Sequence, residues 1–184
     1  EGERGDRRRH DREGGDPGKR IAIMNDDNGY VHEMISWAKR DKLDVRGAHI
    51  TNVVQESRSI SFRLNSVRVF APVLGTHQAH NIALAITAAV AAGMSIADAI
   101  KGAEKISPVD QMMKPLAGVN GSTFIDDTFN NNPDAAIAAL DYLAQTKGKK
   151  ILVFQPMNEL GQYSDSAHES VGKRARQVCD AVIL

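Results

Sequence analysis

The sequence has little cysteine and no excess charge of either sign. Its one cysteine, Cys179, cannot form a disulfide within the chain, and no group of Cys and His residues has the spacing of zinc ligands. The 23 basic and 23 acidic residues cancel, so no overall field attracts nucleic acid or a membrane surface. We therefore expect a protein of a reducing compartment, with no nucleic-acid partner, in which local groups hold any charged ligand.

The sequence also lacks a long hydrophobic run. The longest, residues 82–93, is interrupted by Thr87 and is too short to cross a bilayer, and the N-terminus has no apolar signal-peptide segment. These absences predict a cytoplasmic protein with no membrane insertion. Hydrophobic residues nevertheless form 42% of the chain, which is enough for the core of one domain or of two partial ones.

Both ends of the chain differ from the rest. Residues 1–19 contain no aliphatic or aromatic side chain, which predicts a disordered or non-native tail. Residues 181–184 (AVIL) have the pattern of a buried strand that stops before its turn, and the chain begins without Met. We interpret both ends as truncations, with a genuine terminal strand as the alternative at the C-terminus.

The N-terminal half combines two kinds of periodicity. Residues 21–24 predict a short buried strand, and residues 30–39 carry apolar side chains at helical spacing. Between residues 49 and 70 the alternation has a period of two, which predicts two or three antiparallel strands. Residues 81–93 are almost all small or apolar, so we expect a helix that is buried on every side.

The C-terminal half alternates strands and helices. Ser95 is placed to cap a helix that reaches about residue 105, and Ser107 with Pro108 then interrupts the pattern as a candidate linker. Further strands and helices are predicted in turn at residues 123–126, 133–144, 151–154, 166–178 and 181–184. This order predicts βαβ units, and hence the fold class α/β with a mostly parallel sheet.

A polar loop in residues 125–140 (IDDTFNNNPDAAIAAL) follows one of these strands. Asn132 and Pro133 supply an N-cap and a first-turn proline for the next helix, whose N-terminus favours an anionic group. Asp126 and Asp127 are suited to accept hydrogen bonds from ribose hydroxyls or to hold a metal. Asp and Asn are equally good turn formers, so the pattern alone leaves both interpretations open.

A second polar turn occupies residues 74–81 (LGTHQAHN) and leads into a helix. The Asn81 amide can both donate and accept hydrogen bonds, as recognition of an adenine edge requires. His77 and His80 are three positions apart and suggest a metal, but no carboxylate or third ligand accompanies them.

A third turn lies in residues 149–161 (KKILVFQPMNELG), after a predicted buried strand. We expect it at the same edge of the sheet as the asparagine-rich loop, because both follow the carboxyl ends of parallel strands. Glu159 in this turn is either a functional acid or an ordinary turn carboxylate.

Together with residues 23–27 (IMNDD), these three segments resemble the Mur ligases over about residues 20–184. The family's Asn-x-Asp-Asp strand end, G-x-H-N-x-x-N helix start, D-D-[ST]-Y-N-x-N-P loop and M-x-E-L-G turn occur here in the same order. The resemblance implies the end of a P-loop-type central ATP-binding domain at residues 20–107, followed by a truncated, Rossmann-like C-terminal ligase domain at residues 108–184.

The resemblance also implies a chemistry. A Mur ligase phosphorylates a substrate carboxylate with ATP, which Mg²⁺ accompanies, and an amine then displaces the phosphate. The motifs are most similar to those of members that join D-alanyl-D-alanine to UDP-MurNAc-tripeptide in peptidoglycan synthesis, and we expect a monomer. By this resemblance Asn81 holds adenine with His77 nearby, and the ribose and phosphate side is lined by Asp127, Asn130 and Asn132.

The sequence departs from the family pattern at several positions. Gln78 stands where the first Asn of the helix-start motif belongs, and Phe129 stands in place of Tyr. Gln111 occupies the position of a nucleotide-contacting Arg, for which Lys114 is a candidate substitute. Candidate contacts to the second substrate, or to the closed domain, are Gln111, Lys114, Asn158 and Glu159.

Parts of the family's machinery are missing from the sequence. It holds no phosphate loop, no upstream lysine of the kind that is carbamylated, and no domain for the UDP-sugar. We therefore expect this chain alone to be inactive, with its catalytic residues and most Mg²⁺ ligands elsewhere.

Two alternatives to this function stay open. A folylpolyglutamate synthase or cyanophycin synthetase shares the C-terminal domain, but folate ligases typically carry D-G-A-H-N-P where residues 127–133 are DTFNNNP. A non-catalytic binding module would keep the same sheet and use it to bind a partner.

Overall fold

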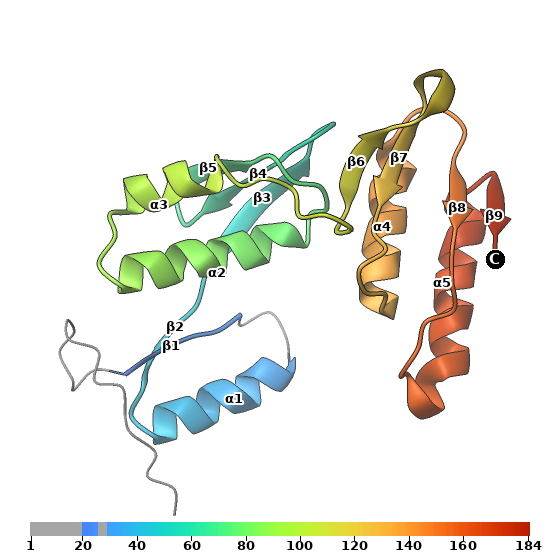
Figure 1. Cartoon of the computed structure of the whole chain (residues 1–184). Helices are drawn as coiled ribbons and strands as arrows, with labels where there is room; N and C mark the ends of the chain where they lie inside the picture. Colours follow the sequence, from blue (N-terminus) through green and yellow to red (C-terminus); the bar gives the residue numbers. More distant parts are fainter. Residues whose placement is uncertain (1–19, 26–28) are drawn as a thin grey trace, which may run out of the picture.

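The computed structural model describes residues 20–25 and 29–184 as a mixed α/β structure (Figure 1). The predicted tail at residues 1–19, and Asp26 and Asp27 of the strand-end motif, lie outside the described residues. No helix within the described ranges is long and apolar enough to span a membrane.

A small βαβ unit comes first. Strand β1 (Ile21–Ile23) pairs in parallel with β2 (Asp44–Arg46), and helix α1 (Gly29–Arg40) connects them. The predicted strand and helix are therefore confirmed, although β1 is only half-buried. Strand β2 was not predicted from the sequence, because three residues are too few to show a periodicity.

A three-stranded antiparallel sheet follows, with β4 in its centre. Its strands are β3 (Ile50–Gln55), β4 (Ile60–Leu64) and β5 (Val67–Ala71). The period-two alternation predicted these strands, and it places Phe62 of β4 opposite Val69 of β5 in the core.

Helices α2 (Gln78–Ala91) and α3 (Ile96–Ala103) pack against this sheet. Ser95 caps α3 as predicted, since its side chain accepts a hydrogen bond from the Asp98 amide. The expectation that the apolar helix would be buried on every side is wrong. Only the face carrying Ala79, Ile82, Ala83 and Ile86 is buried, because the sheet covers one side of α2 and leaves Ala85 and Ala88 exposed.

The C-terminal part opens with a hairpin, of which only the second strand was predicted from the sequence. Strand β6 (Lys114–Ala117) pairs antiparallel with the expected strand β7 (Thr123–Asp126). Strand β6 was not predicted because it contains Pro115, and a proline inside a short run argues against a strand.

The rest of the C-terminal part contains the βαβ unit that the alternating pattern predicted. Strands β8 (Ile151–Val153) and β9 (Ala181–Ile183) pair in parallel, and helix α5 (Ser164–Val178) connects them. Helix α4 (Pro133–Gln145) lies beside α5 (Figure 1), and the guanidinium of Arg174 on α5 binds the Asp141 carboxylate on α4.

The burial of β8 and β9 differs from the prediction of buried strands. Ile151, Val153 and Ile183 are 52%, 67% and 55% exposed. Leu152 and Phe154 point the other way and pack on the cluster that α4 and α5 build around Leu140 and Val171. Helices therefore cover one face of this strand pair only, which a continuous apolar run cannot reveal.

A third, small cluster joins the two parts of the chain. Leu74 after β5, Met113 before β6 and Tyr142 on α4 are buried together, with Ile125 and Ala139 packed against them. The Tyr142 hydroxyl also donates to the Ser57 carbonyl between β3 and β4, at 3.1 Å. The start of α2 and the end of β7 are thereby brought close to each other.

Candidate functional site

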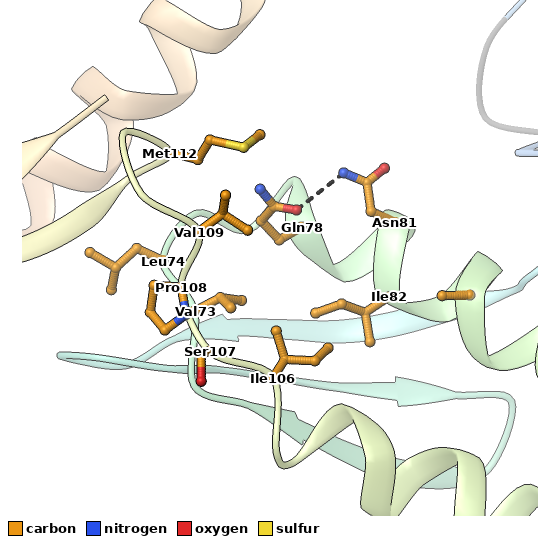
Figure 2. A pocket seen from close by; sticks show the side chains of 11 residues that line it. Val73, Leu74, Gln78, Asn81, Ile82, Ile106, Ser107, Pro108, Val109 and Met112 are labelled. Carbon is orange, nitrogen blue, oxygen red and sulfur yellow. Dashed lines mark hydrogen bonds between the residues drawn. The ribbon is translucent and has the colours of Figure 1, made fainter. Parts of the chain in front are cut away.

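A groove of about 240 Å³ lies between the start of α2 and the segment that leads from α3 to β6 (Figure 2). Its walls are mostly apolar, and they include the candidate linker residues Ser107 and Pro108. The other lining residues are Val73, Leu74, Gln78, Asn81, Ile82, Ala85, Ile106, Val109 and Met112.

Two side-chain amides stand beside each other at this groove. Figure 2 shows the Asn81 side chain turned towards Gln78, and Asn81 Nδ2 donates to Gln78 Oε1 at 3.1 Å. One turn of α2 separates the two residues, which places them on the same face of the helix. An apolar slot edged by an amide donor and an amide acceptor suits a flat heteroaromatic base.

The turn before α2 places His77 close to the backbone. Gly75 has a φ of +90°, and its amide donates to Gln55 Oε1 at 2.8 Å. The His77 ring lies against the Gly75 Cα, where a Cβ would meet it. Desolvation lowers the pKa of His77, and the charge of the Asp127 carboxylate opposes the shift, although much of the residue stays exposed.

Asp127 at the end of β7 comes to the same place from the other part of the chain. Burial raises the pKa of its carboxyl, while the hydrogen bond that Oδ1 accepts from the Met113 amide, at 3.0 Å, and the field of His77 act in the opposite direction. The structure therefore places Asp127 close enough to His77 for the charge of each to influence the pKa of the other.

The asparagine-rich loop is partly explained by local structure. Asn132 Oδ1 accepts from the Ala135 amide at 2.9 Å and so caps α4, as the sequence predicts. Asp126 accepts from the Thr128 hydroxyl at 2.7 Å, a contact typical of a turn. Asn130 is exposed and makes no side-chain hydrogen bond with another described residue.

Gln111 precedes β6, and Lys114 is the first residue of that strand. Gln111 is exposed with a φ of +62°, and its carbonyl accepts from the Phe129 amide at 3.0 Å. The Lys114 ammonium forms an ion pair with Asp110, four residues earlier. This local pair holds Lys114 on its own segment, so the structure does not show it in the role of the missing Arg.

Asn158 and Glu159 are exposed on the turn after β8, and they lie in a different part of the structure from the groove. Glu159 has a φ of +63°. Within the described ranges no three His, Cys, Asp or Glu residues are grouped as metal ligands, so His77 and His80 gain no third partner.

Most of the residues that line the groove were not predicted from the sequence. Ile106, Val109 and Met112 line it from an irregular segment whose apolar residues follow no period. Gln78 was noted only as a departure from the family motif, although its position one turn before Asn81 is visible in the sequence.

The family follows from two comparisons. Residues 113–184 match the family described as Mur ligase, glutamate ligase domain. Over 175 residues the chain is 30% identical to the UDP-N-acetylmuramoyl-tripeptide--D-alanyl-D-alanine ligase of Escherichia coli (strain K12). The chain belongs to the Mur ligase family.

The similarity of this Mur ligase chain to its relatives covers most of its own length but little of theirs. The E. coli alignment takes in 87% of the chain and 38% of the E. coli protein. An enzyme of the same name from Synechocystis sp. is 29% identical, over 87% of the chain and 35% of that protein. The chain thus spans well under half the length of these curated relatives.

Solved structures agree with the fold class. A crystal structure of MurF from Acinetobacter baumannii matches this Mur ligase chain with a TM-score of 0.80 and 26% identity, over 88% of the chain and 38% of that protein. MurF from Thermotoga maritima, solved in complex with ADP, has a TM-score of 0.73 at 20% identity, over 89% of the chain and 39% of that protein, and shows the fold alone. The α/β prediction with a Rossmann-like C-terminal ligase fold is confirmed.

Proposed function

We propose that this chain is part of an ATP-dependent ligase that joins D-alanyl-D-alanine to UDP-MurNAc-tripeptide through an acyl phosphate. The observation that carries the proposal is the 30% identity to an enzyme of that name along 87% of the chain. An alignment of that length includes residues that line the groove. In this proposal residues 20–107 end the central ATP-binding domain, and residues 108–184 belong to the C-terminal domain.

The groove is the proposed adenine site. Its apolar walls would take the faces of the purine, and the Gln78–Asn81 amide pair would meet its polar edge. The segment of residues 106–112 forms one wall, so the base would contact both sides of the domain junction.

The ribose and phosphates would lie towards His77 and Asp127. Asp127 uses Oδ1 for the Met113 amide, and its Oδ2 accepts no hydrogen bond from another described residue, which leaves it for a ribose hydroxyl. Asn130 and the N-terminus of α4, capped by Asn132, would face the phosphate side.

In this function the described residues bind and enclose the nucleotide, and the exclusion of water would protect the labile acyl phosphate. Mg²⁺ would neutralise charge on the ATP phosphates. In this proposal the ATP phosphates hold the metal, and most of its protein ligands lie outside this chain.

Nucleotide binding can be tested on the chain itself by titrating ¹⁵N-labelled protein with ATP. We expect shifts at the side-chain amides of Gln78 and Asn81 and at the backbone of Asp127. The variant Asn81→Leu should lose the shifts at Gln78 and Asp127, whereas Gln162→Leu, at an exposed position that does not line the groove, should keep them. Shifts confined to other parts of the structure would reject the groove as the adenine site.

The substrates require a separate assay. The complete reading frame that encodes this chain should be expressed and tested for ADP release. Release that depends on both UDP-MurNAc-tripeptide and D-alanyl-D-alanine would support the ligase. A complete protein with a G-x-x-x-x-G-K-[ST] motif that releases no ADP with these substrates would reject the substrate assignment.

A further inference from the structure

The carboxamide of Asn81 is held in one orientation by Gln78. Asn81 Nδ2 donates to Gln78 Oε1 at 3.1 Å, and both residues line the groove at the start of α2 (Figure 2). Within the described ranges, Gln78 is the only residue that forms a hydrogen bond with the Asn81 side chain. Gln78 therefore decides which end of the Asn81 amide stays available to a ligand.

The bond leaves a donor at one end of the pair and an acceptor at the other. A carboxamide has two N–H donors and one oxygen acceptor. Because Nδ2 is directed at Gln78, the Oδ1 atom of Asn81 lies on the far side of the same group (Figure 2), and it accepts from no other described residue. Gln78 Nε2 likewise donates to no other described residue.

This arrangement of polar groups suits one class of purine. A 6-aminopurine presents the N–H donors of its exocyclic nitrogen beside a ring nitrogen that accepts. A 6-oxopurine presents an oxygen acceptor at the same position. The free oxygen of Asn81 and a neighbouring N–H therefore match the first class, whereas the same oxygen would repel the carbonyl of the second.

Reversal of the Asn81 amide is opposed by Gln78. If Asn81 alone turned over, its oxygen would face the Gln78 oxygen, and repulsion would replace the hydrogen bond. Both carboxamides would have to rotate together to present a donor in place of Oδ1. A side chain at position 78 that can only accept would forbid that rotation, and one that can only donate would impose it.

We propose that Gln78 determines the base specificity of the groove: by holding Asn81 Nδ2, it presents Asn81 Oδ1 to the exocyclic amino group of a 6-aminopurine nucleotide and disfavours a 6-oxopurine. This inference rests on the proposed function, which assigns the nucleotide to the groove. Asn81 makes the contact with the base, and Gln78 acts through Asn81 as a positioning residue.

The matched ligands for a test are ATP and ITP. ITP carries an oxygen in place of the amino group at position 6, without the additional 2-amino group of GTP. Titration of the ¹⁵N-labelled chain with each nucleotide gives two apparent Kd values, whose ratio measures selection at position 6. We expect the unaltered chain to bind ATP about tenfold more tightly than ITP. Equal affinities would overturn the inference without any variant.

Three substitutions at position 78 should change this ratio differently. In Gln78→Glu the carboxylate can only accept, so the preference for ATP should remain, although the added charge weakens the binding of both nucleotides. In Gln78→Leu the Asn81 amide turns freely, and the ratio should fall to about one. In Gln78→Lys the ammonium donates to Asn81 Oδ1 and turns Nδ2 outward, so ITP should bind at least as tightly as ATP. Gln162→Lys, at an exposed position that does not line the groove, controls for added charge and should keep the original ratio.

The outcomes distinguish this inference from the proposed function. If ATP shifts the groove residues and every variant at position 78 keeps the original ratio, Gln78 does not set the specificity, while ATP binding at the groove stands. A role in helix stability alone would lower the free energy of unfolding of the Leu and Lys variants without changing the ratio, so urea denaturation accompanies each titration. If ATP shifts no residue of the groove in the unaltered chain, the adenine site and this inference are both wrong.

Discussion

The Tyr142 hydroxyl on α4 donates a 3.1 Å hydrogen bond to the Ser57 carbonyl, 85 positions earlier in the chain. The ring of Tyr142 is buried with Leu74 and Met113 at the junction of the two parts. One side chain therefore supplies both an apolar and a polar contact between the antiparallel sheet and the C-terminal helices. These contacts hold the start of α2 near the end of β7, so that the charge of Asp127 influences the pKa of His77.

Removing the Tyr142 hydroxyl should weaken this junction without creating a cavity in it. The variant Tyr142→Phe keeps the ring and loses the bond to Ser57, and we expect it to unfold with a free energy lower by about 0.5–1.5 kcal/mol. Urea denaturation of the chain measures this change. Tyr163→Phe is the matched control, because Tyr163 is 67% exposed and its hydroxyl has no described partner, and an equal effect of the two substitutions would contradict the role of the junction.

The turn at Gly75 is expected to reject any side chain. The variant Gly75→Ala places a Cβ against the His77 ring at a φ of +90°, and we expect destabilisation of about 1–3 kcal/mol together with displacement of His77. Gly148 has a similar φ of +88° with open space around its Cα, so Gly148→Ala measures the backbone cost alone. Thermal unfolding of both variants should show the larger loss at Gly75.

Substitutions of Asn132 and Asn130 should distinguish the effect of helix capping from that of a nucleotide contact. The variant Asn132→Ala removes the cap of α4 and should lower the free energy of unfolding by about 1 kcal/mol, whereas Asn132→Ser should retain most of it. Asn130→Ala should leave stability unchanged, because Asn130 is exposed and has no described side-chain partner. If Asn130 contacts the nucleotide as proposed, its substitution weakens ATP binding alone, and an unchanged ATP affinity would remove it from the site.

Because the pKa of Asp127 is raised in the folded state, the free energy of unfolding should depend on pH in the acidic range. Burial favours the protonated carboxyl in the folded state, so its contribution is present below the ordinary pKa of 3.8 and is lost as the pH rises through the folded-state value. In Asp127→Asn the side-chain oxygen can still accept from Met113 but cannot ionise. We expect the variant to lack this loss of stability, which denaturant titrations across the acidic range would show. Parallel pH profiles for both proteins would contradict the assignment.

The contribution of His77 to stability should change with pH in the opposite direction to that of Asp127, and at a higher pH. Its folded-state pKa lies below the ordinary 6.5, so the stability it contributes is present above that value and is lost as the pH falls through the folded-state pKa. The variant His77→Gln removes the titration and should flatten the stability profile just below the ordinary pKa. The control is His49→Gln. His49 is exposed directly before β3, and we expect this variant to keep the pH dependence of stability that His77 contributes.

Much of the fold could be predicted because it depends on local patterns. The alternation between residues 49 and 70 predicted β3 to β5, and the Asn132–Pro133 pair predicted the start of α4, since cap and proline act within one helical turn. Strand β2 and strand β6 were not predicted, because short strands depend on a partner strand for their stability rather than on their own residues. The burial of α2 and β8 was predicted wrongly for the same reason: a sequence shows how apolar a face is but not what covers it.

The sequence by itself determined the order of the elements and the motifs that carry the resemblance, and with them the family of this chain. It also named Asn81 and Asp127, whose residue types suit a nucleotide, and the resemblance to the family added His77. Only the tertiary structure decided that Asp127 lies close enough to His77 to influence its pKa, and that an irregular apolar segment forms one wall of the groove. Contacts between residues far apart in the chain are set by packing in three dimensions, which leaves no period in the sequence.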